Sequence, residues 1–552
     1  MKLMGAEILV ECLKEQGVTT VFGYPGGTVL DIYDALYRDG KIEHVITSHE
    51  QGAAHAADGW ARVTGKTGVV IATSGPGATN LVTGIATAYM DSVPVVAITG
   101  NVGAAMLGRD SFKEIDIFGI TLPITKHNYI VKDVKELASV VREAFLIANS
   151  GRKGPVLIDI LKNVQSEKAD YVPQKPVYPR AKAVPPRALE SAAQAIAQAQ
   201  RPLIMAGGGV IAAEAANELR ALAERLDAPV VSTLMGLGAF PASHPLFMGM
   251  MGMHGTATAA KLCLEADCIL AVGTRFSDRV ALNRDKFAAG KTVIQIDIDN
   301  AELGKNVPLT HAVLGDVKEA LTTLTPMLPE CRREFSAHAK ELKKTELAAQ
   351  KAPELGHRIL IEAAKLAPKD AIVVTDVGQH QMWTAQYYPI EKPRTFCTSG
   401  GLGTMGYGLG AAIGAAKATG KHVILVTGDG CFNMNLNELS TAVTHELPIT
   451  ILLMNNHALG MVRQWQKLFY GNRFSQTDVR KRTDYVRFAE SFGAVGLAIE
   501  KDEDIVPVLT KALATQTPVL VDCRISNDEN VLPMIKPGQT YDTIITDWEA
   551  RE

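Results

Sequence analysis

Two short motifs late in the chain combine residue types that bind a hard metal ion and a phosphate. Gly428-Asp429-Gly430 follows the apolar run HVILVT, and Asn455-Asn456 follows the apolar run ITILLM. Open α/β sheets bind ligands at the carboxyl ends of their strands, which is where both motifs stand. One carboxylate and one amide oxygen suit Mg²⁺, which keeps few protein ligands and completes its shell with phosphate oxygens. Gly-Asp-Gly alone is a common turn, so the prediction of a magnesium and phosphate site rests on the pair of motifs.

A carboxylate in the first third of the chain stands where a strand is expected to meet a helix. Glu50 opens the small-residue segment EQGAAHAADGWAR, and an isolated Glu there is ordinarily a helix-terminal carboxylate favoured by the helix dipole. The nearby loop SGPGATN, residues 74–80, leads from a strand into a helix. It does not complete G-x-G-x-x-G, because Asn80 stands at the third glycine position. This opposes a dinucleotide fingerprint in the first part of the chain.

The middle of the chain holds several loops of the kind that surround a nucleotide. They are Gly207-Gly208-Gly209, TLMGLGAFP at 233–241, GMHGT at 252–256, GTRFSDR at 273–279 and IDID at 296–299. Such loops at strand ends suit a nucleotide. Taken alone they are a weak signal, since the three glycines could form an ordinary turn.

Short apolar, β-branched runs alternate with helical segments throughout, which is typical of parallel sheets. The predicted strands are 68–73, 94–99, 155–160, 202–206, 229–233, 268–273, 293–298, 371–375, 422–427, 449–454 and 518–523. A proline-rich stretch, 172–187, and a charged stretch, 330–357, divide the chain into three parts. We therefore predict an α/β protein with three doubly wound parallel-sheet domains.

The first and last parts resemble each other. Thr64-Gly65-Lys66 leads into GVVIATSGPG, and Thr419-Gly420-Lys421 leads into HVILVTGDG. Each is followed by a helical stretch and then by Val93-Pro94 or Leu447-Pro448 before the next strand. Landmarks repeated in the same order favour two copies of one α/β domain over a chance likeness between parallel strands.

Composition excludes several classes of protein. The 552 residues carry 56 Lys and Arg against 59 Asp and Glu, so a net charge of −3 gives no broad footprint for nucleic acid or an anionic membrane. No uncharged apolar run reaches the roughly 18–20 residues that a membrane helix needs. The seven cysteines form no Cys-x-x-Cys pair and indicate reduced, mostly buried thiols. We expect a soluble, cytoplasmic enzyme with neither nucleic acid nor membrane as a partner.

Five segments resemble the catalytic subunit of acetohydroxyacid synthase, also called acetolactate synthase. They are FGYPGG at 22–27, HEQGAAHAADGWAR at 49–62, ATSGPGATNLVTG at 72–84, SGGLGTMGYGLGA at 399–411 and NNHALGMVRQWQ at 455–466. The resemblance runs from about residue 4 to 540 and implies the thiamin diphosphate (ThDP)-dependent decarboxylase type of fold. It implies a pyrimidine-binding domain at 1–171, a central FAD-binding domain at 188–330 and a domain for the diphosphate and Mg²⁺ at 358–552.

The resemblance also implies individual site residues. It assigns cofactor contacts in the first part to Pro25, Gly26, Thr73, Pro76 and Asn80. In the last part it assigns them to Val377, Gly378, Gln379, His380, Gly403, Met405, Gly428, Asp429, Gly430, Cys431, Asn456, Leu459, Gly460 and Met461. The expected FAD contacts are Arg152, Gly207, Gly208, Gly209, Thr233, Leu234, Met235, Met253, His254, Gly255, Gly273, Arg275, Asp278, Arg279, Asp297, Ile298 and Asp316.

Further roles follow from the same resemblance. The metal ligands are Asp429, Asn456 and the backbone carbonyl of Ala458. Glu50 becomes the acid that exchanges a proton with the aminopyrimidine of ThDP. The catalytic residues are Glu50, Lys113, Met405, Arg279 and Trp465, with Met405 wedged under the cofactor, where a Met is otherwise usually core filler. Arg279 would hold the carboxylate of the second 2-keto acid, and Trp465, Met253 and Met461 would shape its pocket, although a Trp packed in the core is an equal alternative.

The implied reaction is decarboxylation of pyruvate, followed by condensation of the hydroxyethyl-ThDP carbanion with a second pyruvate or with 2-ketobutyrate. The products, 2-acetolactate and 2-aceto-2-hydroxybutyrate, lead to branched-chain amino acids. ThDP, Mg²⁺ and FAD are the expected cofactors, and the flavin has no redox part. The expected assembly is a homodimer or homotetramer whose clefts combine halves from different chains, and a small regulatory subunit is left open.

Two departures from the family pattern concern the site. Lys113 stands in Phe112-Lys113-Glu114 where the family commonly has Gln, and Asn101 stands where Gln is common. Ser277 and Gly410 are milder differences. The alternatives are a fermentative, FAD-free acetolactate synthase, which the RFSDR segment opposes, and a ThDP- and FAD-dependent oxidase or decarboxylase. Less favoured are a glyoxylate carboligase, which lacks the carboxylate present here as Glu50, a non-catalytic scaffold and a nicotinamide dehydrogenase.

Overall fold

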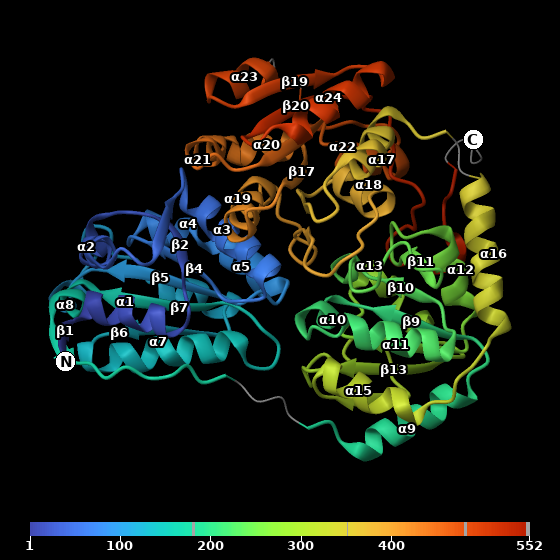
Figure 1. Cartoon of the computed structure of the whole chain (residues 1–552), viewed down its shortest axis with the longest axis horizontal. Helices are drawn as coiled ribbons and strands as arrows, with labels where there is room; N and C mark the ends of the chain where they lie inside the picture. The colour runs from blue at the N-terminus through green and yellow to red at the C-terminus, as the bar shows by residue number, and fades with distance from the viewer. Residues whose placement is uncertain (179–182, 350–351, 480–482, 548–552) are drawn as a thin grey trace.

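The computed structural model describes residues 1–178, 183–349, 352–479 and 483–547; part of the predicted linker at 172–187 lies outside these ranges. Three six-stranded, fully parallel sheets follow one another along the chain. Figure 1 shows them as three units: a blue and cyan one, a green and yellow one, and an orange and red one. The α/β class and the three parallel sheets predicted from the alternating pattern are confirmed.

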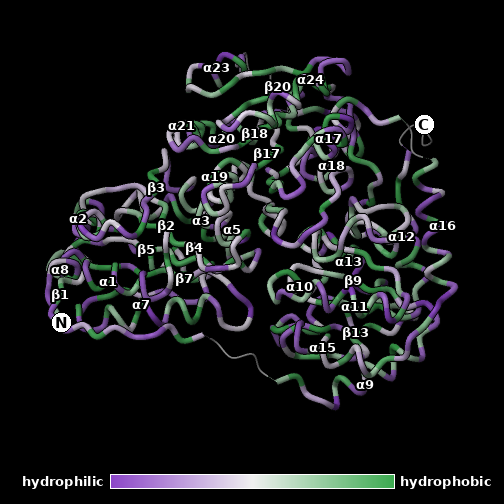
Figure 2. The backbone as a smooth tube through the Cα atoms, in the orientation of Figure 1, coloured by the Kyte–Doolittle hydropathy of each residue, from purple (hydrophilic) through white to green (hydrophobic). Residues whose placement is uncertain are grey.

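The N-terminal sheet has the order β3-β2-β4-β5-β7-β6. Its strands are β2 Thr20–Tyr24, β3 Glu43–Ile46, β4 Gly68–Ala72, β5 Val95–Asn101, β6 His127–Val131 and β7 Val156–Leu161. Along β4, Val69 and Ile71 face the core beneath helices α1 (Gly5–Glu15) and α7 (Val134–Asn149), while Val70 faces the opposite core. Both faces are therefore covered, which explains why the central strands are almost continuously apolar (Figure 2).

The C-terminal sheet repeats the first one. Its order is β16-β15-β17-β18-β20-β19, so both sheets run second, first, third, fourth, sixth, fifth strand. The strands are β15 Ile372–Thr375, β16 Phe396–Cys397, β17 Val423–Gly428, β18 Ile449–Asn455, β19 Val495–Ile499 and β20 Val519–Arg524. This identity of order confirms the duplication predicted from sequence landmarks.

The central sheet has a different order, β11-β10-β9-β12-β13-β14. Its strands are β9 Pro202–Ala206, β10 Val230–Ser232, β11 Phe247–Met250, β12 Cys268–Val272, β13 Thr292–Asp297 and β14 His311–Leu314. This is the third, second, first, fourth, fifth, sixth order of nucleotide-binding sheets, in which ligands bind where the order reverses. Here the reversal lies between β9 and β12.

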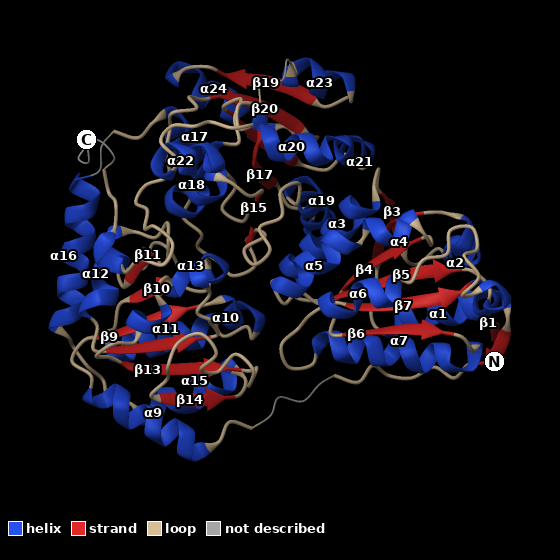
Figure 3. Cartoon of the chain, turned by 180° about the vertical axis from the view of Figure 1, so that it is seen from behind, coloured by secondary structure: helices blue, strands red, loops and turns tan. Residues whose placement is uncertain are grey.

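The first and third units share one hydrophobic core. Helix α3 (Glu50–Thr64) packs against α19 (Gly408–Thr419), and the two lie side by side in both Figures 1 and 3. A Cβ on Gly414 would stand 1.9 Å from the carbonyl oxygen of Ala56, and one on Gly59 would stand 2.2 Å from that of Ala411. Only small residues permit this approach, which explains the Ala- and Gly-rich sequences of both helices.

The remaining secondary structure covers the sheets. The other helices of eight or more residues are α2 Leu30–Asp39, α5 Val82–Met90, α9 Pro186–Gln198, α11 Ala216–Leu226, α12 Ala257–Glu265, α15 Val317–Met327, α16 Glu334–Ala349, α17 Leu355–Leu366, α18 Gln379–Tyr387, α22 Gly460–Phe469 and α24 Asp502–Ala514. Strands β1 Lys2–Met4 and β8 Lys168–Asp170 form a small antiparallel pair. Among the described residues, no helix is long and apolar enough to span a membrane.

Candidate functional site

A cavity lies at the carboxyl ends of β15 and β17, the first and third strands of the C-terminal sheet. The order of that sheet reverses between them, so this is its expected ligand site. Most of the lining residues are the ones that the family resemblance assigns to the cofactor. They are Val377, Gly378, Gln379, His380, Met405, Gly428, Asp429, Gly430, Cys431, Asn456, Ala458, Leu459, Gly460 and Met461, with Trp383, Met454 and Val462 added.

Asp429 is the buried carboxylate of this cavity. It begins the short helix α20 (Asp429–Asn435) directly after β17, and only 2% of its surface is exposed. Burial raises its pKa to about 6. Within the part of the chain that the structure describes, no Lys or Arg pairs with it. A buried carboxylate without a basic partner is suited to a bound cation.

The second and third predicted metal ligands lie on one tight turn after β18. The backbone N–H of Ala458 donates to Asn456 Oδ1 at 3.0 Å, and the intervening His457 has φ 54°. Asn456 Nδ2 donates to Gln379 Oε1 at 3.4 Å. The turn therefore brings the amide oxygen of Asn456 and the backbone of Ala458 to the same wall of the cavity as Asp429.

The cavity also presents an unsatisfied polar atom. His380 Nε2 is buried and has no hydrogen-bond partner among the described residues. Burial lowers the pKa of His380 to about 3, so the ring is neutral and can donate or accept one hydrogen bond there. A Cβ on Gly428 would come within 3.0 Å of His380 Nδ1. The unpaired ring nitrogen of His380, the oxygens of Asp429 and Asn456, and the glycine backbone after β17 together fit a diphosphate with Mg²⁺.

Met405 reaches this cavity from the loop 398–407, between β16 and α19. Its Cε would lie 3.6 Å from a Cβ placed on Gly430, so it stands beside the predicted metal motif. Gly403, two residues earlier, has φ 73° and lies beside Val377. Met405 therefore lines the cavity, and its predicted place under the cofactor stays a prediction.

The N-terminal sheet gathers a second set of predicted residues at its own reversal, between β2 and β4. Asn80 Nδ2 donates to Glu50 Oε2 at 2.9 Å, and Glu50 is 9% exposed. A Cβ on Gly77 would lie 3.1 Å from Glu50 Oε1. Thr73 packs on Gly26, Pro25 directly follows β2, and Pro76 begins the short helix α4 (Pro76–Asn80) after β4.

The position of Glu50 depends on a residue that the sequence did not single out. Glu438, fully buried, accepts hydrogen bonds from the backbone N–H groups of Ser48 (3.1 Å) and His49 (2.9 Å). It comes from the C-terminal unit and fixes the start of α3, on which Glu50 stands. Its place in the polar-looking segment NLNELST gives no hint of burial.

Lys113 is brought to the same half-site. It adopts φ 64°, and its Cα would lie 3.1 Å from a Cβ on Gly75. Its side chain is half-buried, with Nζ 5.9 Å from the ring centroid of Phe112. Glu114 closes this loop by accepting hydrogen bonds from the backbone N–H groups of Ser111 (2.9 Å) and Arg109 (3.3 Å). Lys113 and Glu50 thus flank the same turn, residues 74–77.

Three of the four predicted specificity residues meet at the boundary of the central and C-terminal units. Arg279 Nη1 lies 4.0 Å from Met253 Sδ, and the Arg279 guanidinium lies 5.9 Å from the Trp465 ring centroid. The Arg279 side chain is 57% exposed, so it is open to an incoming anion. Met461 lies one helical turn before Trp465 on α22 and lines the cavity at the carboxyl ends of β15 and β17.

The predicted FAD residues lie at the carboxyl edge of the central sheet. Gly207–Gly209 follow β9 and Gly273 follows β12, on the two sides of the reversal. A Cβ on Gly209 would lie 2.6 Å from Gly273 Cα, so close backbone approach itself demands these glycines. The others follow β10 (Thr233, Leu234, Met235), β11 (Met253, His254, Gly255), β12 (Arg275, Asp278, Arg279) and β13 (Ile298), while Asp297 ends β13.

Polar atoms at this edge lack partners. His254 Nδ1 and Ser232 Oγ are buried and unsatisfied among the described residues. Burial raises the pKa of Asp297 to about 6 and lowers that of Arg275. Unpaired polar groups at the carboxyl ends of the strands of a nucleotide-type sheet fit a bound nucleotide.

Two predicted FAD contacts have structural partners. Arg152 forms an ion pair with Glu302 at 2.8 Å and donates to Ser92 Oγ at 2.8 Å, so it ties the N-terminal unit to the central one. Asp316 caps the N-terminus of α15 by accepting a hydrogen bond from the backbone N–H of Glu319 at 3.1 Å. These contacts account for both residues without a ligand, and their predicted role in binding FAD stays a prediction.

Comparison with known proteins agrees with this geometry. Three family models of thiamine pyrophosphate enzymes match: the N-terminal TPP binding domain at residues 3–120, the central domain at 189–324 and the C-terminal TPP binding domain at 376–523. The acetolactate synthase of Mycobacterium bovis is 46% identical over 98% of this chain and 91% of its own length. The chain belongs to the acetolactate synthase family. The large subunits of Corynebacterium glutamicum and Haemophilus influenzae are 46% and 42% identical, and the matches cover 90% and 98% of those proteins.

Family membership makes the two half-sites parts of one ThDP-binding enzyme. The matched N-terminal and C-terminal TPP domains contain Glu50 and Asp429 respectively. The resemblance drawn from five short segments therefore extends over nearly the whole chain.

Proposed function

We propose that the chain is an acetohydroxyacid synthase that condenses pyruvate, after decarboxylation, with a second pyruvate or with 2-ketobutyrate. The observation that carries the proposal is the cavity at β15 and β17, whose lining includes Asp429, Asn456, Ala458 and Met405. Family membership supports the same activity. When bound, ThDP supplies the carbon nucleophile for this chemistry.

The residues divide the work between the two half-sites. Asp429, Asn456 and the carbonyl of Ala458 would hold Mg²⁺, and the backbone after β15 and β17 would hold the diphosphate. Glu50 would exchange a proton at its carboxyl oxygens, and the amide of Asn80 orients that carboxyl. With these roles, we propose 1–171 as the pyrimidine domain and 358–552 as the diphosphate domain.

Acceptor selection would lie with Arg279 and Trp465. The guanidinium of Arg279 presents a planar pair of donors to the carboxylate of the second 2-keto acid. Its neighbours Met253 and Trp465 supply an apolar wall for the alkyl group. Lys113, on the opposite half-site, would add a positive charge.

FAD is proposed as a bound group of the central domain, 188–330, without a redox role. The order of the central sheet and the unpaired atoms of His254 and Ser232 support a nucleotide at this edge. The free state of all seven cysteines supports a reducing, cytoplasmic location. Relatives named as large subunits make a small regulatory subunit a further proposed partner.

The active unit is proposed to be at least a homodimer. Among the residues that the structure describes, none before Val377 lines the diphosphate cavity, so Glu50 of the same chain does not complete it. A second chain would bring its Glu50 there. Co-expressed Glu50→Gln and Asp429→Ala chains should recover activity through mixed dimers that keep one intact cleft. Inactive mixed dimers, proven by differential tags, would contradict shared clefts.

The activity itself is tested with pyruvate, ThDP and Mg²⁺, with and without FAD. We expect carbon dioxide and 2-acetolactate, identified by NMR, and no net flavin reduction under anaerobic turnover. Acetate with electron release would instead identify an oxidase, and acetaldehyde a simple decarboxylase.

A further inference from the structure

The loop 398–407 carries Met405, yet its own sequence does not hold it in one conformation. Four of its ten residues are glycines, and Gly403 and Gly406 have φ 73° and 86°. Glycine loses the most conformational freedom on ordering. The equivalent connection in the N-terminal unit, residues 47–49, has only three residues. The longer loop therefore requires contacts from elsewhere.

The residues around Met405 are held within the C-terminal unit. The Thr404 backbone N–H donates to Ser399 Oγ at 3.0 Å, and the Gly406 N–H donates to Asp376 Oδ1 at 2.8 Å. Asn435 Nδ2 donates to the Gly406 carbonyl at 2.6 Å. These bonds clamp both neighbours of Met405.

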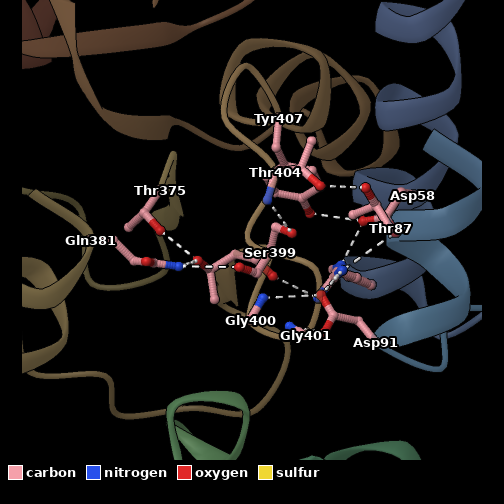
Figure 4. A network of polar contacts seen from close by, with 12 residues as sticks. Asp58, Thr87, Asp91, Thr375, Gln381, Ser399, Gly400, Gly401, Thr404 and Tyr407 are labelled. Carbon is pink, nitrogen blue, oxygen red and sulfur yellow. Dashed lines mark hydrogen bonds and ion pairs between the residues drawn. The ribbon is translucent and has the colours of Figure 1, made fainter. Parts of the chain in front are cut away.

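The beginning of the loop is held by the N-terminal unit of the same chain (Figure 4). The Asp91 carboxylate accepts hydrogen bonds from the backbone N–H groups of Gly400 (3.1 Å) and Gly401 (2.7 Å). The hydroxyls of Thr87 and Thr404 lie 2.7 Å apart, both buried. Both anchors come from helix α5 and its end.

A buried ion-pair network holds the Asp91 carboxylate in place. Arg62 pairs with Asp91 at 2.9 Å and with Asp58 at 2.6 Å, and the two carboxylates are fully buried. Burial lowers the pKa of Arg62, but the attraction of the two carboxylates is stronger and holds that pKa well above its usual value. Arg62 Nη1 also donates to the Thr398 carbonyl at 2.9 Å. A carboxylate at the end of α5 opposes the helix dipole, so a local preference does not explain Asp91.

We propose that Asp91, held by Arg62, is a positioning residue that sets the conformation of the loop 398–407 and thereby the place of Met405 in the cofactor cavity. The part concerning the cofactor rests on the proposed function; the part concerning the loop does not. Neither residue touches the cavity, since both lie outside its lining. Their effect is therefore transmitted through the backbone of Gly400 and Gly401.

The test compares Asp91→Asn with Asp267→Asn in the full-length chain. Asp267 is a matched control because it also accepts two consecutive backbone N–H groups, from Gln200 and Arg201, both at 2.9 Å. Amide hydrogen exchange is measured without cofactor on peptides covering 398–408. We expect about 10–100-fold faster exchange there in Asp91→Asn, the equivalent of one lost charged hydrogen bond, and no change in Asp267→Asn.

The link to the cofactor is read by ThDP titration and by steady-state kinetics. Asp91→Asn should weaken ThDP binding and lower kcat, while the KM for pyruvate stays near that of the parent. If Asp91→Asn fails to fold, Thr87→Val removes only the hydroxyl contact with Thr404 and should give the same pattern more weakly.

Two results would overturn the proposal. Unchanged exchange at 398–408 would show that Asp91 does not hold the loop. Faster exchange with unaltered ThDP affinity and kcat would show that the loop does not position the cofactor. Because exchange is read without cofactor, a wrong proposed function would alter the second readout and leave the first intact.

Discussion

The N-terminal and C-terminal units share one scaffold but carry different residues at the ends of their strands. Beyond their strand order, they share a buried contact at the same place. Asn101 Nδ2 donates to Asp159 at 2.5 Å, and Asn455 Nδ2 donates to Asp522 at 2.8 Å, each between the fourth and sixth strands. Asn101, a departure from the family pattern, is thus the counterpart of the first Asn of the Asn-Asn motif.

The copies differ in which loop carries the carboxylate. In the C-terminal unit Asp429 follows the third strand, whereas in the N-terminal unit the third strand leads into Ser74-Gly75-Pro76 and Glu50 follows the second. Conversely, the loop after the second strand of the C-terminal unit holds Met405. The scaffold supplies the place where strand order reverses, and the loops decide which residues stand there: the proposed metal and phosphate ligands in one unit and the proposed acid in the other.

The largest effect is expected in the C-terminal unit, which carries the proposed metal ligands. Asp429→Ala removes the only carboxylate of the proposed ligand set. Losing a residue that only hydrogen-bonds to a metal ligand costs roughly 10–100-fold in metal affinity, so losing the ligand itself should lower ThDP affinity by more than that. Calorimetry with ThDP and Mg²⁺ measures this. Asp370→Ala, which removes an exposed partner of Lys421, is the control and should bind normally. Unaltered affinity in Asp429→Ala would mean that the metal lies elsewhere.

A change at Glu50 in the N-terminal unit should slow activation of the cofactor and not weaken its binding. Glu50→Gln keeps the shape and the contact with Asn80 but removes the exchangeable acid, so proton exchange at the thiazolium carbon of bound ThDP should slow roughly 10²–10⁴-fold. Quenched-flow NMR measures that exchange directly. Glu43→Gln, at the opposite end of β3 and paired with Lys417, should match the parent. The same rate in Glu50→Gln would remove Glu50 from cofactor activation.

Sequence patterns predicted the middle of each sheet and not its edges. Every predicted apolar run is a strand, but the six edge strands β3, β6, β11, β14, β16 and β19 were not predicted, nor was β2. Central strands are buried on both faces and read as continuous apolar runs, whereas an edge strand such as β3, EHVI, is half-exposed and short.

The candidate site divides in the same way. Candidate residues next to strand ends, such as Asp429 and Glu50, can be proposed from the pairing of short motifs and from the family resemblance, and their roles stay predictions. Arg62, Asp91 and Glu438 could not, because each acts on a segment hundreds of residues away, and a charged residue in a helix ordinarily indicates a solvated face. Arg62 even lies inside the quoted segment 49–62, where nothing local reveals its burial.

The paired Asn–Asp contacts offer a pH-dependent test. Burial raises the pKa of Asp159 to about 6, with Thr99 and Asn101 as hydrogen-bond donors, whereas Asp522 has an ion pair with Arg524 at 3.1 Å. Because the folded-state pKa of Asp159 exceeds the unfolded value, its ionised form costs stability above about pH 6, and the cost disappears as the pH falls below about 4.

Asp159→Asn should therefore stabilise the N-terminal unit relative to the parent at pH 7.5 by about 2 kcal/mol more than at pH 4.5. Amide hydrogen exchange of β5 and β7 at the two pH values measures this locally, as a multidomain chain requires. Asp522→Asn loses its ion pair with Arg524 and should be destabilising at pH 7.5. A pH-independent difference for Asp159→Asn would show that the carboxyl is already neutral or well solvated.

The smallest effect is expected at Lys113, where the chain departs from its relatives. The backbone and Cβ of Lys113 lie against Gly75, at the turn that Glu50 also contacts, so the residue stands beside the proposed acid half-site. Because the side chain is only half-buried, solvent screens its charge, and Lys113→Gln should raise the acceptor KM by only about two- to tenfold. The parent KM should rise with salt more steeply than that of the variant, since screening acts on the charge that the variant lacks.

Lys162→Gln, which removes a half-exposed partner of Asp31 in the same unit, is the control for a general loss of charge. Equal KM values and equal salt dependence in the parent and Lys113→Gln would mean that this lysine lies outside the path of the acceptor and that the amide of the relatives and the amine here are interchangeable.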